Sequence, residues 1–231
     1  MTNSHRITGV RGSSRALLLA ICMALASACA SRRGAVHDQL RAAGQEDPLA
    51  VSDALEALIA VGQDTPADRE YAYEIVRQSS QDTAASMFAR ADVTGRFVQQ
   101  RGFLAANLVP DIERSARRSR ELDPNFREGA ATRLLGTLYV IAPAAVLEHG
   151  DSEQGLELLE GLVEAHPDVL ENHLRVAEAY IALGDVAPAR PHLCRCLASK
   201  EKLRRDEQIL LTHLFVDAGS QSCPQTTKPT P

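Results

Sequence analysis

A spacing of 34 residues between two matching segments limits the fold of this sequence more than any other feature. Gly150-Asp151 and Gly184-Asp185 are 34 positions apart, and each dipeptide separates two segments with the apolar periodicity of a helix. A helical pair of this length cannot bury its apolar face alone, so successive pairs must stack on one another. Small and large residues recur in register after each dipeptide: Gly155 aligns with Ala189, Leu159 with Leu193, and Leu162 with Cys196.

The first helix of each pair carries a small residue followed three positions later by Tyr, as in Gly136 with Tyr139 and Ala177 with Tyr180. The small residue lets the two helices of a pair touch, and the Tyr wedges between neighbouring pairs. With Pro167 closing a unit, this pattern resembles the tetratricopeptide repeat over about residues 110–218. The resemblance implies an all-α solenoid of helical pairs with a closing C-terminal helix. An ordinary helical bundle with coincidental spacing is the alternative.

The repeat family binds its ligands on a concave surface lined by the first helix of each pair. The set that this resemblance implies lacks the Asn and Lys residues that clamp peptide carboxylates, and the alternative is that these side chains face solvent or a neighbouring helix. The concave-surface candidates are Arg133, Thr137, Val140, Glu171, Leu174, Glu178 and Ile181.

The repeat before Pro167 is too long, because Pro124 and Pro167 are 43 residues apart instead of 34. Most of the excess is the apolar segment VIAPAAVLEHG, which contains Pro143, Val146 and Leu147. If this segment were exposed, it would form an apolar surface patch that favours aggregation. We therefore predict that it packs into a groove or lines a cavity.

Caps at several helix starts define the boundaries of the expected helices. Asp47 precedes Pro48, and Thr65 with Asp68 forms a capping box. Asp151 with Gln154 and Asp168 with Glu171 predict the same reciprocal arrangement. No run of alternating β-branched residues predicts a strand. The expected helices are 48–62, 66–79, 82–101, 103–121, 127–141, 151–165, 168–183, 186–199 and 202–217, with a kink at Pro191 and with Lys202, Arg204 and Arg205 facing solvent.

The first 28 residues have the pattern of a secretory signal: a basic start, a short apolar run and small residues at its end. The ending LASAC resembles a bacterial lipobox and predicts lipidation of Cys29, although Ala26 stands where Leu is usual and Leu25 precedes it. An ordinary signal cut near Ala28 is the alternative. The expected mature chain has a flexible tether over 29–47, a helical domain over 48–218 and a disordered tail over 219–231.

The charge balance disfavours nucleic acid as a partner. The formal net charge is -5, and residues 1–28 contain three Arg and no acid, so the mature chain carries -8. Membrane contact is expected through the lipid anchor only. The one basic run, RSARRSR from Arg114 to Arg120, is interpreted as a solvated helix face, with docking of an acidic partner as the alternative.

The sequence lacks a recognisable catalytic constellation. GDSEQG does not have the spacing of a nucleophile elbow, and the histidines do not form a compact ligand set. We expect no enzyme activity, no cofactor and no metal. Of the cysteines outside the signal and the anchor, Cys194 and Cys196 point to opposite sides of a helix, so either could pair with Cys223 or all three could stay free.

A predicted lipid anchor, degenerate helical pairs, the segment FREGAATRLLGTLYVIAP and the apolar connector together resemble the T component of TRAP transporters, most strongly over residues 100–190. This resemblance implies a periplasm-facing lipoprotein of the bacterial outer membrane. It would dock a TRAP-type periplasmic solute-binding protein, and could pass an apolar ligand along a channel near residues 140–149. The alternative is a scaffold for outer-membrane or secretion machinery. The sequence leaves homo-oligomerisation open.

Overall fold

The structure is a computed structural model, and it describes residues 34–219 and residue 223. The predicted signal peptide 1–28, Cys29 and nearly all of the predicted tail therefore lie outside the described residues. Within the described part of the chain, the residues from Val36 onward form one compact unit.

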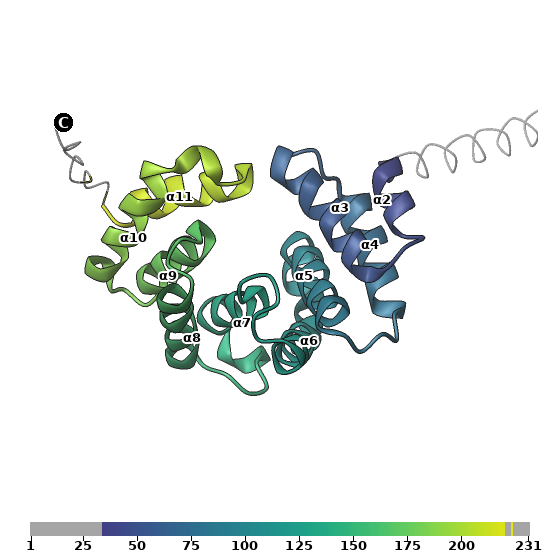
Figure 1. The fold of residues 1–231 in the computed structure, drawn as a ribbon, viewed down its shortest axis with the longest axis horizontal. Coiled ribbons are helices and arrows are strands. Elements are labelled where there is room, and N and C mark those ends of the chain that lie inside the picture. Colours follow the sequence, from purple (N-terminus) through teal and green to yellow (C-terminus); the bar gives the residue numbers. More distant parts are fainter. Residues whose placement is uncertain (1–33, 220–222, 224–231) are drawn as a thin grey trace, which may run out of the picture. The chain divides into compact units, whose positions relative to one another are not determined.

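All regular secondary structure over residues 34–219 is helical, which confirms the predicted all-α class. The helices pack as consecutive antiparallel pairs, α3 with α4, α5 with α6, α7 with α8 and α9 with α10, followed by α11 (Figure 1). The elements are α2 (Asp38–Ala43), α3 (Pro48–Val61), α4 (Pro66–Gln78), α5 (Ala84–Arg101), η1 (Gly102–Leu108), α6 (Val109–Leu122), α7 (Ala130–Ile141), η2 (Ala144–Val146), α8 (Ser152–Ala165), α9 (Leu170–Ala182), α10 (Val186–Ala198), η3 (Lys200–Lys202) and α11 (Arg205–Asp217).

Most of the predicted caps are present. The Asp47 side chain accepts a hydrogen bond from the Ala50 backbone N–H at 2.9 Å, and Thr65 and Asp68 form the full capping box. The Asp151 carboxylate caps α8 without the return bond from Gln154 that we predicted. The cap predicted at Asp168 is wrong: α9 begins at Leu170, and the Asp168 carboxylate pairs with Arg195 at 2.9 Å.

The flexible tether predicted over 29–47 is wrong for its second half. Residues from Asp38 to Ala43 form α2, and Leu40 is fully buried in the core with Val51 and Leu55. The His37 backbone N–H also donates to the Asp68 carboxylate at 2.8 Å. The folded unit therefore starts before Pro48, because one apolar turn is enough to dock a short helix that propensity alone would not predict.

The predicted contact between the helices of a pair is confirmed. A Cβ on Gly136 would lie 2.7 Å from Leu159 Cγ and 2.9 Å from the Gly155 carbonyl oxygen, so only glycine allows α7 and α8 to approach this closely. The buried Tyr139 packs with Ile112 of α6, as predicted for the residue between neighbouring pairs.

The pairs follow a curve that brings the last helix back to the first. Helices α3, α5, α7, α9 and α11 lie on the inner side, and α4, α6, α8 and α10 lie outside them (Figure 1). The first turn of α11 contacts α3, where the Arg204 guanidinium pairs with the Glu56 carboxylate and Arg205 donates to the Val61 carbonyl at 3.3 Å. The prediction that Arg204 faces solvent is therefore wrong, since this side chain is half-buried against α3 where α11 closes the curve. Lys202 and Arg205 are exposed, as predicted.

Some helix boundaries differ from those predicted. Residues 102–108 form the 3-10 segment η1 ahead of α6. Helix α7 starts three residues later than expected, because Arg127 and Glu128 take positive φ angles of 48° and 56° before Gly129. Helix α10 continues through Pro191. No helix of the described part of the chain is long and apolar enough to cross a membrane.

Candidate binding groove

A groove of about 1080 Å³ opens on the outer side of the stack, between α6 and α8 and above α7. Its walls come from the second helices of two successive pairs, and its floor comes from the first helix of the later pair. The long unit that holds the apolar segment therefore forms two of its three sides. The lining residues are Arg117, Arg120, Glu121, Pro124, Asn125, Thr132, Leu135, Tyr139, Gln154, Glu157, Leu158, Glu160, Gly161, Leu162, Glu164, Ala165 and His166.

The α6 wall carries Arg117, Arg120 and Glu121, and Glu121 is paired with Arg118 at 3.5 Å, so the wall is basic on balance. Arg117 hydrogen-bonds to the Tyr139 hydroxyl, and this bond raises the pKa of its guanidinium. Arg120 is exposed and makes no ion pair with any residue that the structure describes. The other two arginines of the run point elsewhere: Arg114 pairs with Glu148 at 3.0 Å, and Arg118 pairs with Asp82 at 2.6 Å. Helical spacing thus divides the run into a paired side and a groove side.

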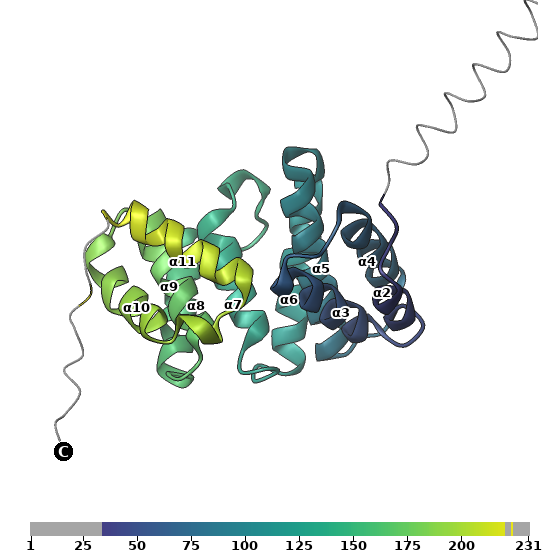
Figure 2. The same ribbon diagram turned by 90° about the horizontal axis from the view of Figure 1, so that it is seen from above.

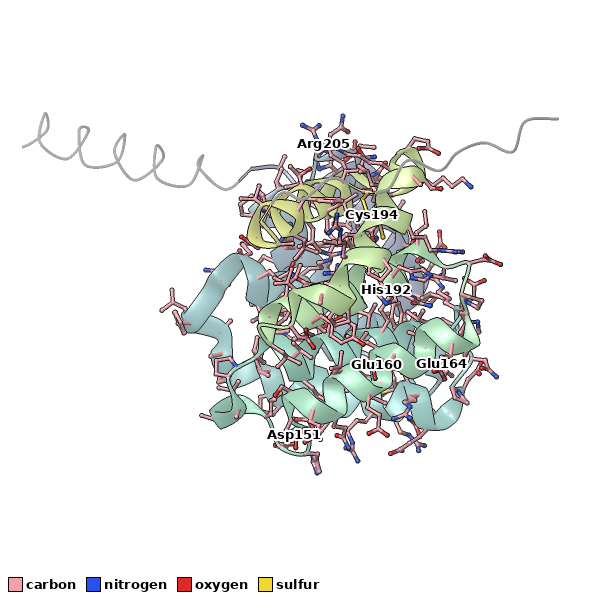
Figure 3. All side chains as sticks on the ribbon, turned by 90° about the vertical axis from the view of Figure 1, so that its left-hand side faces the viewer. Asp151, Glu160, Glu164, His192, Cys194 and Arg205 are labelled. Carbon is pink, nitrogen blue, oxygen red and sulfur yellow. A yellow bond between two sulfur atoms is a disulfide. The ribbon has the colours of Figure 1, made fainter. Side chains whose placement is uncertain are left out.

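The α8 wall is acidic. Glu157, Glu160 and Glu164 follow one another at helical spacing along the groove, and Figure 3 shows Glu160 and Glu164 one turn apart on α8. The Tyr180 hydroxyl donates to Glu160, and burial together with this bond raises the pKa of Tyr180 to about 12. Glu157 and Glu164 make no ion pair within residues 34–219. The groove is therefore bounded by positive charge on one side and negative charge on the other.

The floor is apolar, since Leu135 and Tyr139 of α7 are buried beneath it. On the α8 wall, a Cβ built on Gly161 would meet no atom within 4 Å. The Tyr139 hydroxyl donates to Glu113 at 3.0 Å. The Glu113 carboxylate also accepts the backbone N–H groups of Glu148 at 2.7 Å and of His149 at 2.9 Å. The floor residue Tyr139 is thus held from below by a buried carboxylate with several partners.

The arrangement suits non-covalent recognition of a polypeptide segment. Apolar side chains of such a segment would cover the floor, while its acidic and basic groups would face α6 and α8 respectively. Within the described residues, no group of three His, Cys, Asp or Glu side chains could hold a metal ion.

The concave-surface candidates lie on the inner helices, away from the groove. Arg133 donates to Asn172 Oδ1 at 2.7 Å, and Thr137 donates to the Arg133 carbonyl at 2.8 Å. Glu178 pairs with Arg175 at 2.8 Å. Val140, Glu171 and Ile181 are half-buried, and Val140 and Ile181 pack against core clusters. Leu174 is fully buried in the core, so its assignment to a binding surface is wrong.

The apolar segment also differs from its prediction. Leu147 packs against the core cluster of α6 and α7, but Pro143 and its neighbours Ala144 and Ala145 are exposed, and Val146 is half-buried. None of these residues lines the groove. The prediction that the segment packs away as a whole is wrong, because Glu113 holds only its last residues.

A network of charged side chains occupies the inner side. Arg96 of α5 binds the Glu56 carboxylate at 2.6 Å and 2.7 Å, and Arg204 binds the same carboxylate from α11. Ser52 donates to Asp92 at 2.8 Å beside this group. Burial and the nearby Glu56 raise the pKa of Asp92 to about 7. The network joins α3, α5 and α11.

Among the described cysteines there is one disulfide, between Cys194 and Cys223, with 5.5 Å between their Cα atoms. Its position on α10 is visible in Figure 3. Cys196 is a free, buried thiol, and burial raises its pKa to about 12. The pairing of Cys223 with one of the α10 cysteines, and the absence of a bridge within α10, agree with the sequence argument.

Comparison with known proteins gives no family assignment. No model of a known protein family matches the chain, and no curated protein is significantly similar to it.

The sequence does not predict the groove, because its walls come from the second helices of two pairs. Two sequence features mark its walls. One is the basic run on α6, for which docking of an acidic partner is the alternative interpretation. The other is the repeated Glu spacing in ELLEGLVEAH. Neither shows that the two faces lie opposite each other.

Proposed function

We propose that this chain is a non-enzymatic binding module that holds a segment of a partner protein in the groove between α6 and α8. The observation that carries the proposal is the combination of an apolar floor with unpaired charges of opposite sign on the two walls. A partner segment with acidic residues on one side and basic residues on the other would meet Arg120 and Glu164 with complementary charge. Because both walls belong to packed helices, the groove exists before binding and little ordering is needed.

The predicted lipid anchor and the resemblance to the TRAP T component add a location and a first candidate partner. They favour a module on the periplasmic side of the bacterial outer membrane that docks a TRAP-type solute-binding protein. The alternative is a scaffold that binds a component of outer-membrane or secretion machinery. Both use the same groove, so the identity of the captured partner distinguishes them.

Site-specific photo-crosslinking tests this proposal directly. A photoreactive amino acid replaces Gly161, where a Cβ meets no neighbour, and the full chain is expressed in its native cells. The matched control places the same amino acid at Leu197 of α10, which is exposed and outside the groove. We expect a discrete adduct from position 161 and none from position 197.

Mass spectrometry of the adduct then separates the candidates. A solute-binding protein supports transport docking, whereas a secretion or outer-membrane component supports the scaffold. Equal labelling from both positions, or no adduct from position 161, would contradict binding in the groove.

A further inference from the structure

Phe103 and Leu104 form an exposed apolar pair in the turn after α5. Their exposed fractions are 95% and 88%, the highest among the large apolar side chains in residues 34–219. A single exposed apolar residue is ordinary, but two adjacent ones that touch almost nothing in their own chain offer apolar area to another surface.

A second apolar segment lies at the same edge of the stack. Ile141 is half-exposed at the end of α7, and Pro143, Ala144 and Ala145 after it are exposed. Glu113, near the start of α6, holds the last residues of this segment, and α6 directly follows η1. The turn after α5 and the loop after α7 therefore lie on one side of the pairs (Figure 2).

The chain enters the folded unit beside this edge. His37 is held by the Asp68 carboxylate, at the start of α4. The next residue, Arg69, donates to the Arg96 carbonyl at 3.1 Å, and Glu70 pairs with Arg101 at 3.4 Å in the last turn of α5. The first residues of the unit thus lie close to the turn that carries Phe103.

The length of the preceding chain limits the distance to the predicted anchor. His37 follows Cys29 by eight residues, which span at most about 28 Å when fully extended. A lipid on Cys29 would therefore hold the edge near the bilayer surface.

The edge carries little charge. Between Gln99 and Leu108 the only charged residue is Arg101, which is paired with Glu70, and residues 141–147 have none. An uncharged apolar edge suits insertion between lipid headgroups, whereas attraction to anionic lipid would require a basic surface.

We infer that Phe103, Leu104, Ile141 and the exposed residues 143–145, which together we call the apolar edge, insert into the interfacial layer of a lipid bilayer. This inference rests on the proposed lipid anchor of the binding module, and it adds a second membrane contact to the anchor, which the sequence predicts as the only one. Two large side chains are too few for lasting attachment by themselves, but an anchor raises their effective concentration at the surface. The edge then fixes the orientation of the unit on the membrane.

A single introduced tryptophan tests the insertion, because the chain has no Trp of its own. Residues 30–231, which contain the whole folded unit, carry an N-terminal hexahistidine tag and bind vesicles of phosphatidylcholine with a nickel-chelating lipid. For Phe103→Trp we expect emission at shorter wavelength on the vesicles and quenching by brominated lipid. Leu104→Trp should behave in the same way.

The matched control is Leu197→Trp, at the end of α10 and at the opposite end of the helical pairs. It should stay in water and show neither change, although the tag holds it on the same vesicles. Circular dichroism of each variant should equal that of the parent, since all three positions are exposed.

Emission of both edge variants that stays at the wavelength of water-exposed indole, with no more bromolipid quenching than the control, would overturn the inference. The same result is expected if the edge binds another protein instead of lipid, so a protein contact would also overturn the inference. Because the tag replaces the lipid, the result does not depend on lipidation of Cys29, and the crosslink at position 161 tests the groove separately.

Discussion

The inner and outer sides of the helical stack are both rich in charge, but they differ in what balances it. On the inner side, the Glu56 carboxylate is shared by Arg96 and Arg204. In the outer groove, Arg120 and Glu164 face each other's wall without an ion pair to any described residue. Charge neutralised within the chain closes the curve of helices, whereas unpaired charge beside an apolar floor is available to a partner.

Removal of Arg96 should give the largest effect on the inner side. Burial lowers the pKa of this guanidinium, but the carboxylates of Glu56 and Asp92 outweigh that effect and raise it. Arg96→Met leaves Glu56, Asp92 and Asp206 close together, with Arg204 as the remaining cation that pairs with Glu56 and Asp206. We expect a loss of about 3–5 kcal/mol in the free energy of unfolding, measured by urea denaturation.

The matched control is Arg118→Met on the outer side, where the lost pair with Asp82 is exposed. Its denaturation midpoint should stay close to that of the parent chain. Equal losses for the two variants would remove the distinction between a structural inner network and ordinary surface pairs.

The inner charge network should also make the free energy of unfolding depend on pH, because Asp92 beside it changes its protonation state. Its folded pKa of about 7 exceeds the usual value of 3.8, so the folded state holds the proton more tightly than the unfolded chain. This contribution favours folding at low pH and is lost as the pH rises from about 4 to about 7. Asp92→Asn should therefore become more stable than the parent over that range, by about 4 kcal/mol above pH 7. A difference that does not change with pH would contradict the assignment.

Two glycines sharpen the comparison between packed helices and the open groove. Gly136→Ala should cost about 1–2 kcal/mol, because its Cβ would overlap Leu159 and the Gly155 carbonyl. Gly161→Ala should instead gain about 0.5–1 kcal/mol, since its Cβ meets open space and alanine favours the helix. Thermal unfolding should show a lower melting temperature for Gly136→Ala and a higher one for Gly161→Ala than for the parent chain. A loss at Gly161 would mean that the α8 wall of the groove is more closely packed than it is in the structure.

The sequence predicts those parts of the fold that depend on neighbouring residues. Thr65 and Asp68 cap α4 as expected because both groups lie within one turn. The close contact of α7 with α8 at Gly136 follows from the repeat pattern, which is read from residues near one another in the sequence. The closing contact between Arg204 and Glu56 spans 148 residues and depends on the summed rotation of every pair, which no local pattern contains.

The candidate site was predictable only in part, for the same reason. The inner-side candidates lie on the inner helices, but Leu174 belongs to the core and Arg133 is engaged by Asn172. The groove combines side chains of α6 and α8 that do not belong to the same pair. The sequence predicts a charged face on each of the two helices. That these faces lie opposite each other follows only from the packed structure.

The most direct test of the central claim is the yield of the position-161 crosslink in variants that change one side at a time. Arg120→Glu reverses a groove charge that has no pairing partner in the described chain, and Glu171→Gln changes an inner-side candidate without touching the groove. We expect at least a tenfold loss of adduct for Arg120→Glu, about 1.4 kcal/mol of binding free energy, and an unchanged yield for Glu171→Gln. Full adduct with Arg120→Glu and a loss with Glu171→Gln would place binding on the inner side and contradict the account.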